Sequence, residues 1–278
     1  MIVEFGWDNT LIIAYLPVMK HVRLEPFLDF FESHVEFFRK GTPEDVANID
    51  LKKDHSLCVL DEARMITRSL DLAPGFAGLC HVAALFHDLG RFTQYETYQT
   101  FNDKVSEDHG RLGLKVLRQT GVLKGLSSRE RALVQTVVLL HNRRFLPRGL
   151  SSEASLALNV VRDADKLDIF PVVLTHFAPN APLNLVVMLN LKPHETEYTP
   201  GVLAQVMARG LAEYNDMVWI NDFKLLICSW VYDLNFPATR RAVLERGYLD
   251  AIIGLLPDTP EFRLLGERLK KDLAAEIS

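Results

Sequence analysis

The stretch Leu85-Phe86-His87-Asp88-Leu89-Gly90-Arg91-Phe92 places an imidazole beside a carboxylate at the end of an apolar run. The run is too apolar for a surface loop, and Pro74 and Gly90 stand where a helix would begin and end. We therefore expect His87 and Asp88 in the last turn of a helix. Neighbouring helical residues point about 100° apart, so the pair can share one metal ion only at the helix end, together with ligands from other segments. The simpler alternative is an imidazole near the helix dipole beside a solvated carboxylate.

The composition is that of a folded globular protein. Of the 278 residues, 48% are hydrophobic and 24% are charged, which suits a large core and argues against a disordered or fibrous chain. The net charge of −5 does not favour a nucleic-acid polymer as partner, because phosphate backbones are bound by basic faces. A small anionic ligand is compatible with this charge, since one pocket can be basic on an acidic protein.

Neither a membrane segment nor a disulfide framework is expected. No apolar run reaches the roughly 18 to 20 residues that span a bilayer, and the run 11–16 follows acidic residues where a signal peptide has a basic segment. The cysteines Cys58, Cys80 and Cys228 are odd in number and outside any CxxC pattern. They indicate a reducing cytoplasm and argue against a thiolate zinc site.

Apolar spacing of the helical period recurs along most of the chain, whereas the alternation typical of strands does not. We therefore predict an all-α fold, a helical bundle with additional C-terminal helices. Residues 1–24 mix both patterns and are left unassigned, residues 95–103 are expected to form a loop, and Pro171 is expected to end a helix. The predicted helices cover residues 26–40, 49–70 (after a cap at 42–44), 74–90, 106–121, 127–141, 151–170, 202–232, 249–256 and 262–277.

Ligand-type side chains recur near one end or on the inner face of five successive predicted helices. His55 lies on the apolar stripe in the middle of its helix, and a histidine that faces inward needs a partner. His109 falls in a first turn and His141 near a last turn. The chain also carries the acidic stretch Asp163-Ala164-Asp165-Lys166-Leu167-Asp168.

In this order, His, His-Asp, His, His and Asp, the sequence resembles the HD-domain metal-dependent phosphohydrolases, which are all-helical. The resemblance covers about residues 50–170, and the stretch 229–236 adds a less specific likeness. It implies a basic ligand set of His55, His87, Asp88 and Asp165, because the family's last aspartate stands between a small and a basic residue. Some members hold a second ion with two more histidines, which His109 and His141 match. Asn142 departs from those dinuclear members that have a further histidine there.

Six histidine and carboxylate ligands without a thiolate suit divalent Mn, Fe, Co, Ni or Zn, and they exceed what one catalytic ion takes. We therefore expect two ions roughly 3.5–4 Å apart, bridged by Asp88. One would take the basic set, and the other would take Asp88, His109 and His141. A hydroxide between the ions would attack the phosphorus in line.

Three further residues are candidates for catalysis. Arg91 follows the doublet closely and is expected to contact phosphate, although a surface cation is the alternative. Lys166 is assigned a similar role, and Asp163 is expected to orient a ligand histidine as a hydrogen-bond acceptor. Arg143 and Arg144 are either solvated loop cations or substrate contacts.

The expected organisation is an N-terminal segment (1–48) packed on the core, an HD metal-binding core (49–175) and a C-terminal helical extension of the same domain (176–278). The implied activity is hydrolysis of a phosphomonoester or phosphodiester, with a nucleotide as the expected substrate. The partner is then a small anionic phosphorylated substrate, and the oligomeric state is open. A di-iron oxygenase related to inositol oxygenase and a non-catalytic metal-binding regulatory module are the alternatives.

Overall fold

A computed structural model describes residues 21–177 and 191–277. These residues form helices, turns and one isolated parallel bridge between Lys192 and Trp219, without any strand. The chain divides into two compact units. The described part of the first covers residues 21–93 and 108–162, and that of the second covers 94–107, 163–177 and 191–277. The predicted all-α fold is confirmed, whereas the predicted domain boundaries stay a prediction.

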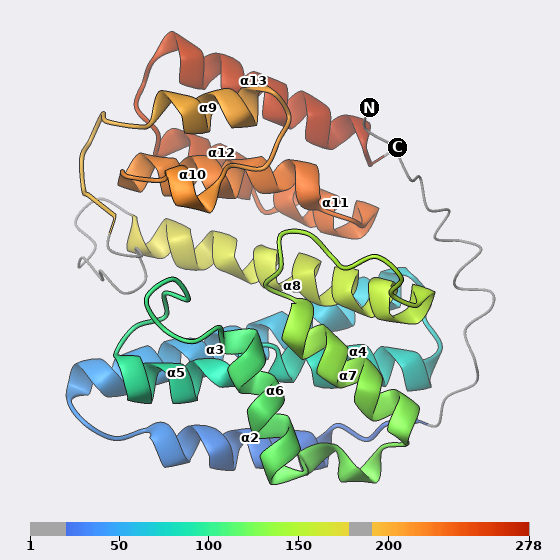
Figure 1. Cartoon of the computed structure of the whole chain (residues 1–278). Coiled ribbons are helices and arrows are strands. Elements are labelled where there is room, and N and C mark those ends of the chain that lie inside the picture. The colour runs from blue at the N-terminus through green and yellow to red at the C-terminus, as the bar shows by residue number, and fades with distance from the viewer. Residues whose placement is uncertain (1–20, 178–190, 278) are drawn as a thin grey trace. The chain divides into compact units, whose positions relative to one another are not determined.

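The first unit is built from the helices that precede and follow the His-Asp doublet in the chain, which Figure 1 labels. Helix α3 packs on α4, α4 on α7 and α6 on α7, while α2 contacts both α3 and α4. Two helices, α5 (Gly90–Tyr98) and α8 (Ser152–His176), begin in this unit and continue into the second. The helices wholly within it are α2 (Glu25–Phe38), α3 (Pro43–Ser69), α4 (Pro74–Phe86), α6 (His109–Thr120), the 3₁₀ helix η1 (Val122–Gly125) and α7 (Ser128–Leu140).

Local capping explains where several of these helices begin. The side chains of Thr42 and Asp45 form a capping box, so α3 runs 27 residues from Pro43 and is longer than the predicted segment. Ser127 and Glu130 form another at the start of α7. Helix α6 is capped by Asp108, whose side chain accepts a hydrogen bond from a backbone N–H in the first turn. Glu107 and Asp108, which lie within the predicted helix 106–121, therefore precede α6.

Gly90 does not end a helix as predicted. Helix α4 ends at Phe86, and α5 begins at Gly90 and continues to Tyr98, so much of the loop expected at 95–103 is helical. A Cβ atom on Gly90 would lie 2.1 Å from the carbonyl oxygen of His109. The glycine thus permits a close approach between two backbone segments, and this explains its presence better than a helix stop does.

Tertiary packing also overrides two other sequence signals. Helix α8 continues through Pro171 to His176, because Phe170 and Val173 on either side of the proline are buried. The single helical segment predicted over residues 202–232 is wrong, since an irregular stretch with a short 3₁₀ helix separates two helices there. The carboxylate of Asp222 holds this stretch by accepting hydrogen bonds from the backbone of Val218 and Trp219.

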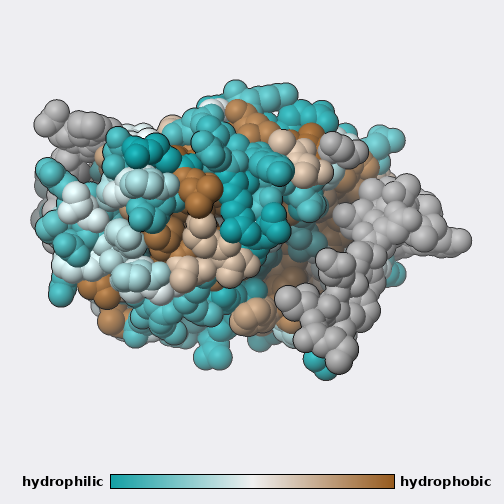
Figure 2. Space-filling model, turned by 90° about the horizontal axis from the view of Figure 1, so that it is seen from above, coloured by the Kyte–Doolittle hydropathy of each residue, from teal (hydrophilic) through white to brown (hydrophobic). Residues whose placement is uncertain are grey.

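The second unit contains the C-terminal helices, in which α10 packs on α9 and α12, and α11, α12 and α13 contact one another. Helix α11 was not predicted. Figure 2 looks down on the face where α9 and α13 lie in Figure 1, and it shows hydrophobic patches among predominantly hydrophilic residues. None of the described helices is both long and apolar enough to cross a membrane. The helices are α9 (Pro200–Met207), η2 (Tyr214–Asp216), α10 (Ile220–Ser229), η3 (Trp230–Asp233), α11 (Pro237–Glu245), α12 (Tyr248–Gly254) and α13 (Pro260–Ala275).

Candidate metal centre

The turn between α4 and α5 carries the His-Asp doublet. His87 is the C-cap residue of α4, and Asp88 follows it before α5 begins. His87 is completely buried and Asp88 is 3% exposed. Because polar groups in such a place cannot reach bulk water, both side chains need polar partners inside the protein.

Four buried histidines direct their Nε2 atoms at the carboxylate of Asp88. His55, in the middle of α3, and His87 lie 3.6 and 3.8 Å from Oδ2. His109, the first residue of α6, and His141, the C-cap of α7, lie 3.4 and 3.7 Å from Oδ1. Each oxygen of one carboxylate therefore faces its own pair of imidazoles.

The two Nε2 atoms within each pair are close together. They are 3.2 Å apart between His55 and His87 and 3.0 Å apart between His109 and His141, and the members of both pairs are separated by 32 residues in the sequence. Two nitrogens bound to one ion at about 2.0–2.1 Å, with tetrahedral or octahedral angles, are also about 3 Å apart. Each pair thus has the spacing of two ligands of one ion.

Backbone carbonyl groups fix which ring nitrogen carries the proton. The Nδ1 atom of His87 lies 2.7 Å from the carbonyl oxygen of Ala84, and that of His141 lies 2.9 Å from the carbonyl oxygen of Val138. A carbonyl oxygen only accepts, so Nδ1 must donate, and Nε2 of each neutral ring then presents its lone pair to the centre. These carbonyls belong to the last turn of α4 and α7, where the helix no longer supplies every acceptor with its usual backbone donor; that of Ala84 also accepts from the backbone N–H of His87.

Two cations balance the buried carboxylate. The Nζ atom of Lys52, one turn before His55 on α3, lies 2.8 Å from Oδ2 of Asp88, and Nε of Arg91 lies 3.3 Å from Oδ1. Burial by itself would raise the pKa of Asp88, but the charges of Lys52 and Arg91 outweigh it and hold that pKa well below its ordinary value. Asp88 is therefore an anion at neutral pH, as a bridging ligand must be.

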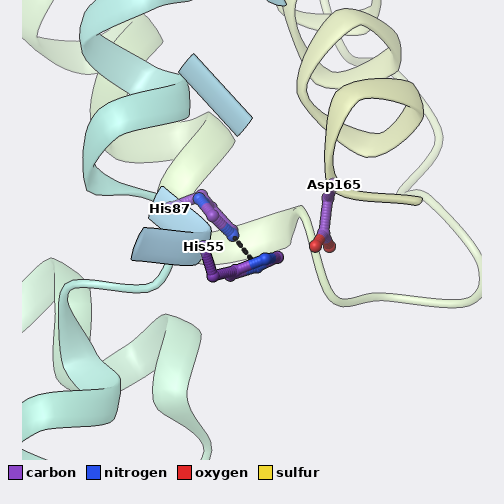
Figure 3. A group of neighbouring side chains, drawn as sticks. All are labelled: His55, His87 and Asp165. Atoms are coloured by element: carbon purple, nitrogen blue, oxygen red, sulfur yellow. Dashed lines mark hydrogen bonds between the residues drawn. The ribbon is translucent and has the colours of Figure 1, made fainter. Parts of the chain in front are cut away.

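Asp165 on α8 is the last of the predicted ligands. Figure 3 shows it as a neighbour of His55 and His87, whose Nε2 atoms are joined by the dashed line. One ligand atom of each of these three residues lies within 4.8 Å of the others, and the same is true of His87, Asp88 and His141. These nitrogen and carboxylate donors, without a thiolate, fit a divalent transition metal.

Residues 53–169 match the family model of the HD domain. Over this segment the chain is similar to an HD domain. The match includes every residue of the predicted ligand set, and it confirms the likeness to the HD-domain superfamily, most of whose members are metal-dependent hydrolases. No curated protein and no solved structure matched the chain.

Two charged side chains, Arg162 and Asp108, hold the segment after His141. The guanidinium of Arg162, buried on α8, donates to the carbonyl oxygens of His141, at 3.3 Å, and Arg143. Asp108 accepts a hydrogen bond from the side-chain amide of Asn142 at 3.2 Å and pairs with the guanidinium of Arg143 at 3.3 Å. Because Asp108 immediately precedes His109, these contacts tie together the chain segments that carry both ligands of the second pair.

Asp163 and Lys166 contact the segment before α11. The carboxylate of Asp163 accepts hydrogen bonds from the backbone N–H groups of Asn235 and Phe236, at 2.9 and 3.1 Å for its Oδ2 atom. The Nζ atom of Lys166 lies 2.7 Å from a carboxylate oxygen of Asp233. These contacts of the described residues include no ligand histidine. The catalytic roles expected for Asp163 and Lys166 therefore stay predictions.

Sequence reasoning missed Lys52 and Arg162. Lys52 stands three residues before His55, so helical spacing places it on the ligand's side of α3, and this signal was available. Arg162 precedes the acidic stretch and resembles an ordinary surface cation until the burial of its helix is known. Lys52 pairs with Asp88, Arg162 holds the backbone after His141, and neither is a proposed ligand.

Proposed function

We propose that this HD-domain chain is a metal-dependent phosphohydrolase that holds two divalent ions and cleaves a phosphomonoester or phosphodiester of a nucleotide. One observation carries the proposal. The two oxygens of Asp88 each face a separate pair of imidazole Nε2 atoms, at 3.4 to 3.8 Å. A carboxylate whose two oxygens are surrounded in this way is suited to bridge two metal ions.

The ligands divide into two groups on this proposal. His55, His87 and Asp165 would hold one ion with Oδ2 of Asp88, and His109 and His141 would hold the other with Oδ1. Two ions held in this way would supply an activated water and would neutralise charge on a phosphoryl group.

The side chains around the ligands prepare the site. The carbonyl groups at the ends of α4 and α7 keep the rings of His87 and His141 in the tautomer that binds metal. Burial of Asp88 and the four histidines excludes water, which strengthens their interaction with charged groups. Arg91 lies three residues after Asp88 and touches its carboxylate, so its guanidinium is placed to donate charge-assisted hydrogen bonds to a phosphate bound there.

The oxygenase alternative shares the same six ligands, so the ligand set does not separate the two reactions. Lys52 and Arg91 at the centre favour an anionic substrate, which supports the hydrolase. An intact set of ligand residues argues against a purely regulatory metal module. The proposed cytoplasmic location is supported by the odd number of cysteines, three, and by their wide spacing outside any CxxC pattern.

Metal content and phosphate release test the proposal together. Protein purified without oxygen should contain two transition-metal ions per chain by elemental analysis. Under nitrogen it should release phosphate from at least one member of a panel of nucleotides and sugar phosphates. If the metal-replete protein releases no phosphate but consumes O₂ with a reduced di-iron centre and an organic substrate, the oxygenase replaces the hydrolase.

A further inference from the structure

The loop between α7 and α8 has a fixed base beside the second histidine pair. His141 is the C-cap of α7 and a proposed ligand. The next two residues are held by Asp108 through their side chains, and Arg162 binds the backbone at both ends of the 141–143 segment. Arg143 keeps 39% of its side chain exposed while it is paired with Asp108. The base of the loop therefore presents one guanidinium at a fixed place beside the centre.

The tip of the same loop is exposed, basic and aromatic. Phe145 is 80% exposed, and the guanidinium of Arg144 lies over its ring at 5.4 Å from the centroid. Residues 142–150 include Arg143, Arg144 and Arg148 and no acid, although the whole chain carries a net charge of −5. A positive loop on an acidic protein attracts anions to this place.

The tip lies within reach of a molecule bound at the centre. Phe145 follows the ligand His141 by four residues, a span of at most roughly 14 Å for an extended chain. A single exposed aromatic residue is common on protein surfaces and by itself indicates nothing. Phe37 on α2 is such a residue, 64% exposed with Lys40 4.6 Å from its ring centroid. Phe145 differs from Phe37 because its loop is held by contacts with the segments that carry the proposed ligands His109 and His141.

We propose that this loop recognises the nucleoside part and the phosphates of the substrate. Phe145 stacks on the base. Arg143 and Arg144 pair with oxygens of phosphate groups other than the one bound at the metal centre. Aromatic stacking accepts any base because every base has a π face, and guanidinium groups suit phosphate geometry. This inference rests on the proposed function and adds to it the residues that would select a nucleoside phosphate in preference to sugar phosphates or other small phosphomonoesters.

The test compares a nucleoside phosphate with a phosphomonoester that has no ring, glycerol phosphate, on metal-replete full-length protein. Phe145→Ala should weaken binding of the nucleoside phosphate by calorimetry, and lower kcat/KM for it, by roughly five- to a hundredfold. The values for glycerol phosphate should stay unchanged. Phe145→Trp should retain nucleoside binding, whereas Phe145→Leu, which is apolar but has no ring, should behave like the alanine variant. Phe37→Ala is the matched control and should leave the binding and kcat/KM of both compounds unchanged.

Each result decides a separate question. The recognition role is wrong if Phe145→Ala and Phe37→Ala bind the nucleoside phosphate equally well. It is also wrong if Phe145→Ala loses affinity for glycerol phosphate as much as for the nucleoside phosphate. The role is also wrong if the unchanged protein binds no nucleoside phosphate. If it binds one through Phe145 but hydrolyses neither compound, the proposed hydrolase activity fails while the recognition loop stands.

Discussion

Replacing Gly90 with alanine should push the start of α6 away from the doublet. The added Cβ atom would lie 2.1 Å from the carbonyl oxygen of His109 and 2.5 Å from the backbone nitrogen of Gly113, and real Cβ atoms essentially never approach closer than 3.0 Å. The backbone of His109 must therefore shift by about 0.9 Å, from 2.1 to 3.0 Å. Overpacking costs typically 1–3 kcal/mol, and since backbone cannot rotate aside we expect a loss of about 3 kcal/mol in the free energy of unfolding.

The same shift should weaken binding of the second ion, because His109 is one of its proposed ligands. Urea unfolding measures the first effect and elemental analysis the second. Gly125→Ala is the control, since a Cβ atom there meets nothing within 4 Å, and its stability should stay within about 0.5 kcal/mol of the unchanged protein. A Cβ atom on Gly113 would lie 2.9 Å from the side chain of Val138, so the free energy of unfolding of Gly113→Ala should fall between those of the other two variants. The reasoning fails if Gly90→Ala is as stable as Gly125→Ala and keeps two ions.

Other substitutions test the ligands, the phosphate contact and a buried histidine. Asp88→Ala should remove both ions, and two ions still bound would refute the bridge. His109→Ala and His141→Ala should each lose one ion by elemental analysis and keep the other, whereas equal loss of both would favour a single-ion site. Arg91→Ala should lower kcat/KM on a phosphoester about ten- to a hundredfold with metal content unchanged, since a hydrogen bond to a charged group contributes roughly 1.5–3 kcal/mol. An unchanged kcat/KM would exclude that contact. Burial lowers the pKa of His34 from 6.5 to about 4, so between these values only the unfolded chain takes up the proton, and stability falls as the pH falls. His34→Phe should recover about 2 kcal/mol of the unfolding free energy lost between pH 7 and pH 5 in urea titrations; the same pH dependence in both proteins would contradict this.

Helix starts were predictable where the signal is local. The capping residues Thr42 and Ser127 act on backbone groups within three residues, so their effect can be read directly from the sequence. Pro171 gave the opposite result, because its local tendency to end a helix is outweighed by burial of Phe170 and Val173. Gly90 misled in a similar way, since the reason for it lies in a backbone segment that follows much later in the chain.

The burial of the predicted ligand histidines could be foreseen because helical spacing and helix ends restrict where an imidazole can point. His55 on an apolar stripe and His141 at a helix end both proved to be buried at the centre. The cations were less accessible to sequence reasoning. Arg91 was found by its closeness to the doublet, whereas Lys52 acts on Asp88 across 36 residues of sequence and Arg162 acts through backbone carbonyls that only the fold brings near it.

The equal construction of the two imidazole pairs has an evolutionary consequence. Helices α3 and α4 carry one pair and α6 and α7 the other, with the same separation of 32 residues and the same ring contact to the carbonyl three residues earlier. On the proposed division, each pair of helices would supply two histidines to one ion, Asp88 would be common to both ions, and α8 would add Asp165 to the first. A lineage could gain or lose one ion by exchanging the two histidines of a single hairpin, while the other hairpin and the fold persist. On this proposal the number of ions would be a trait that can evolve separately from the architecture.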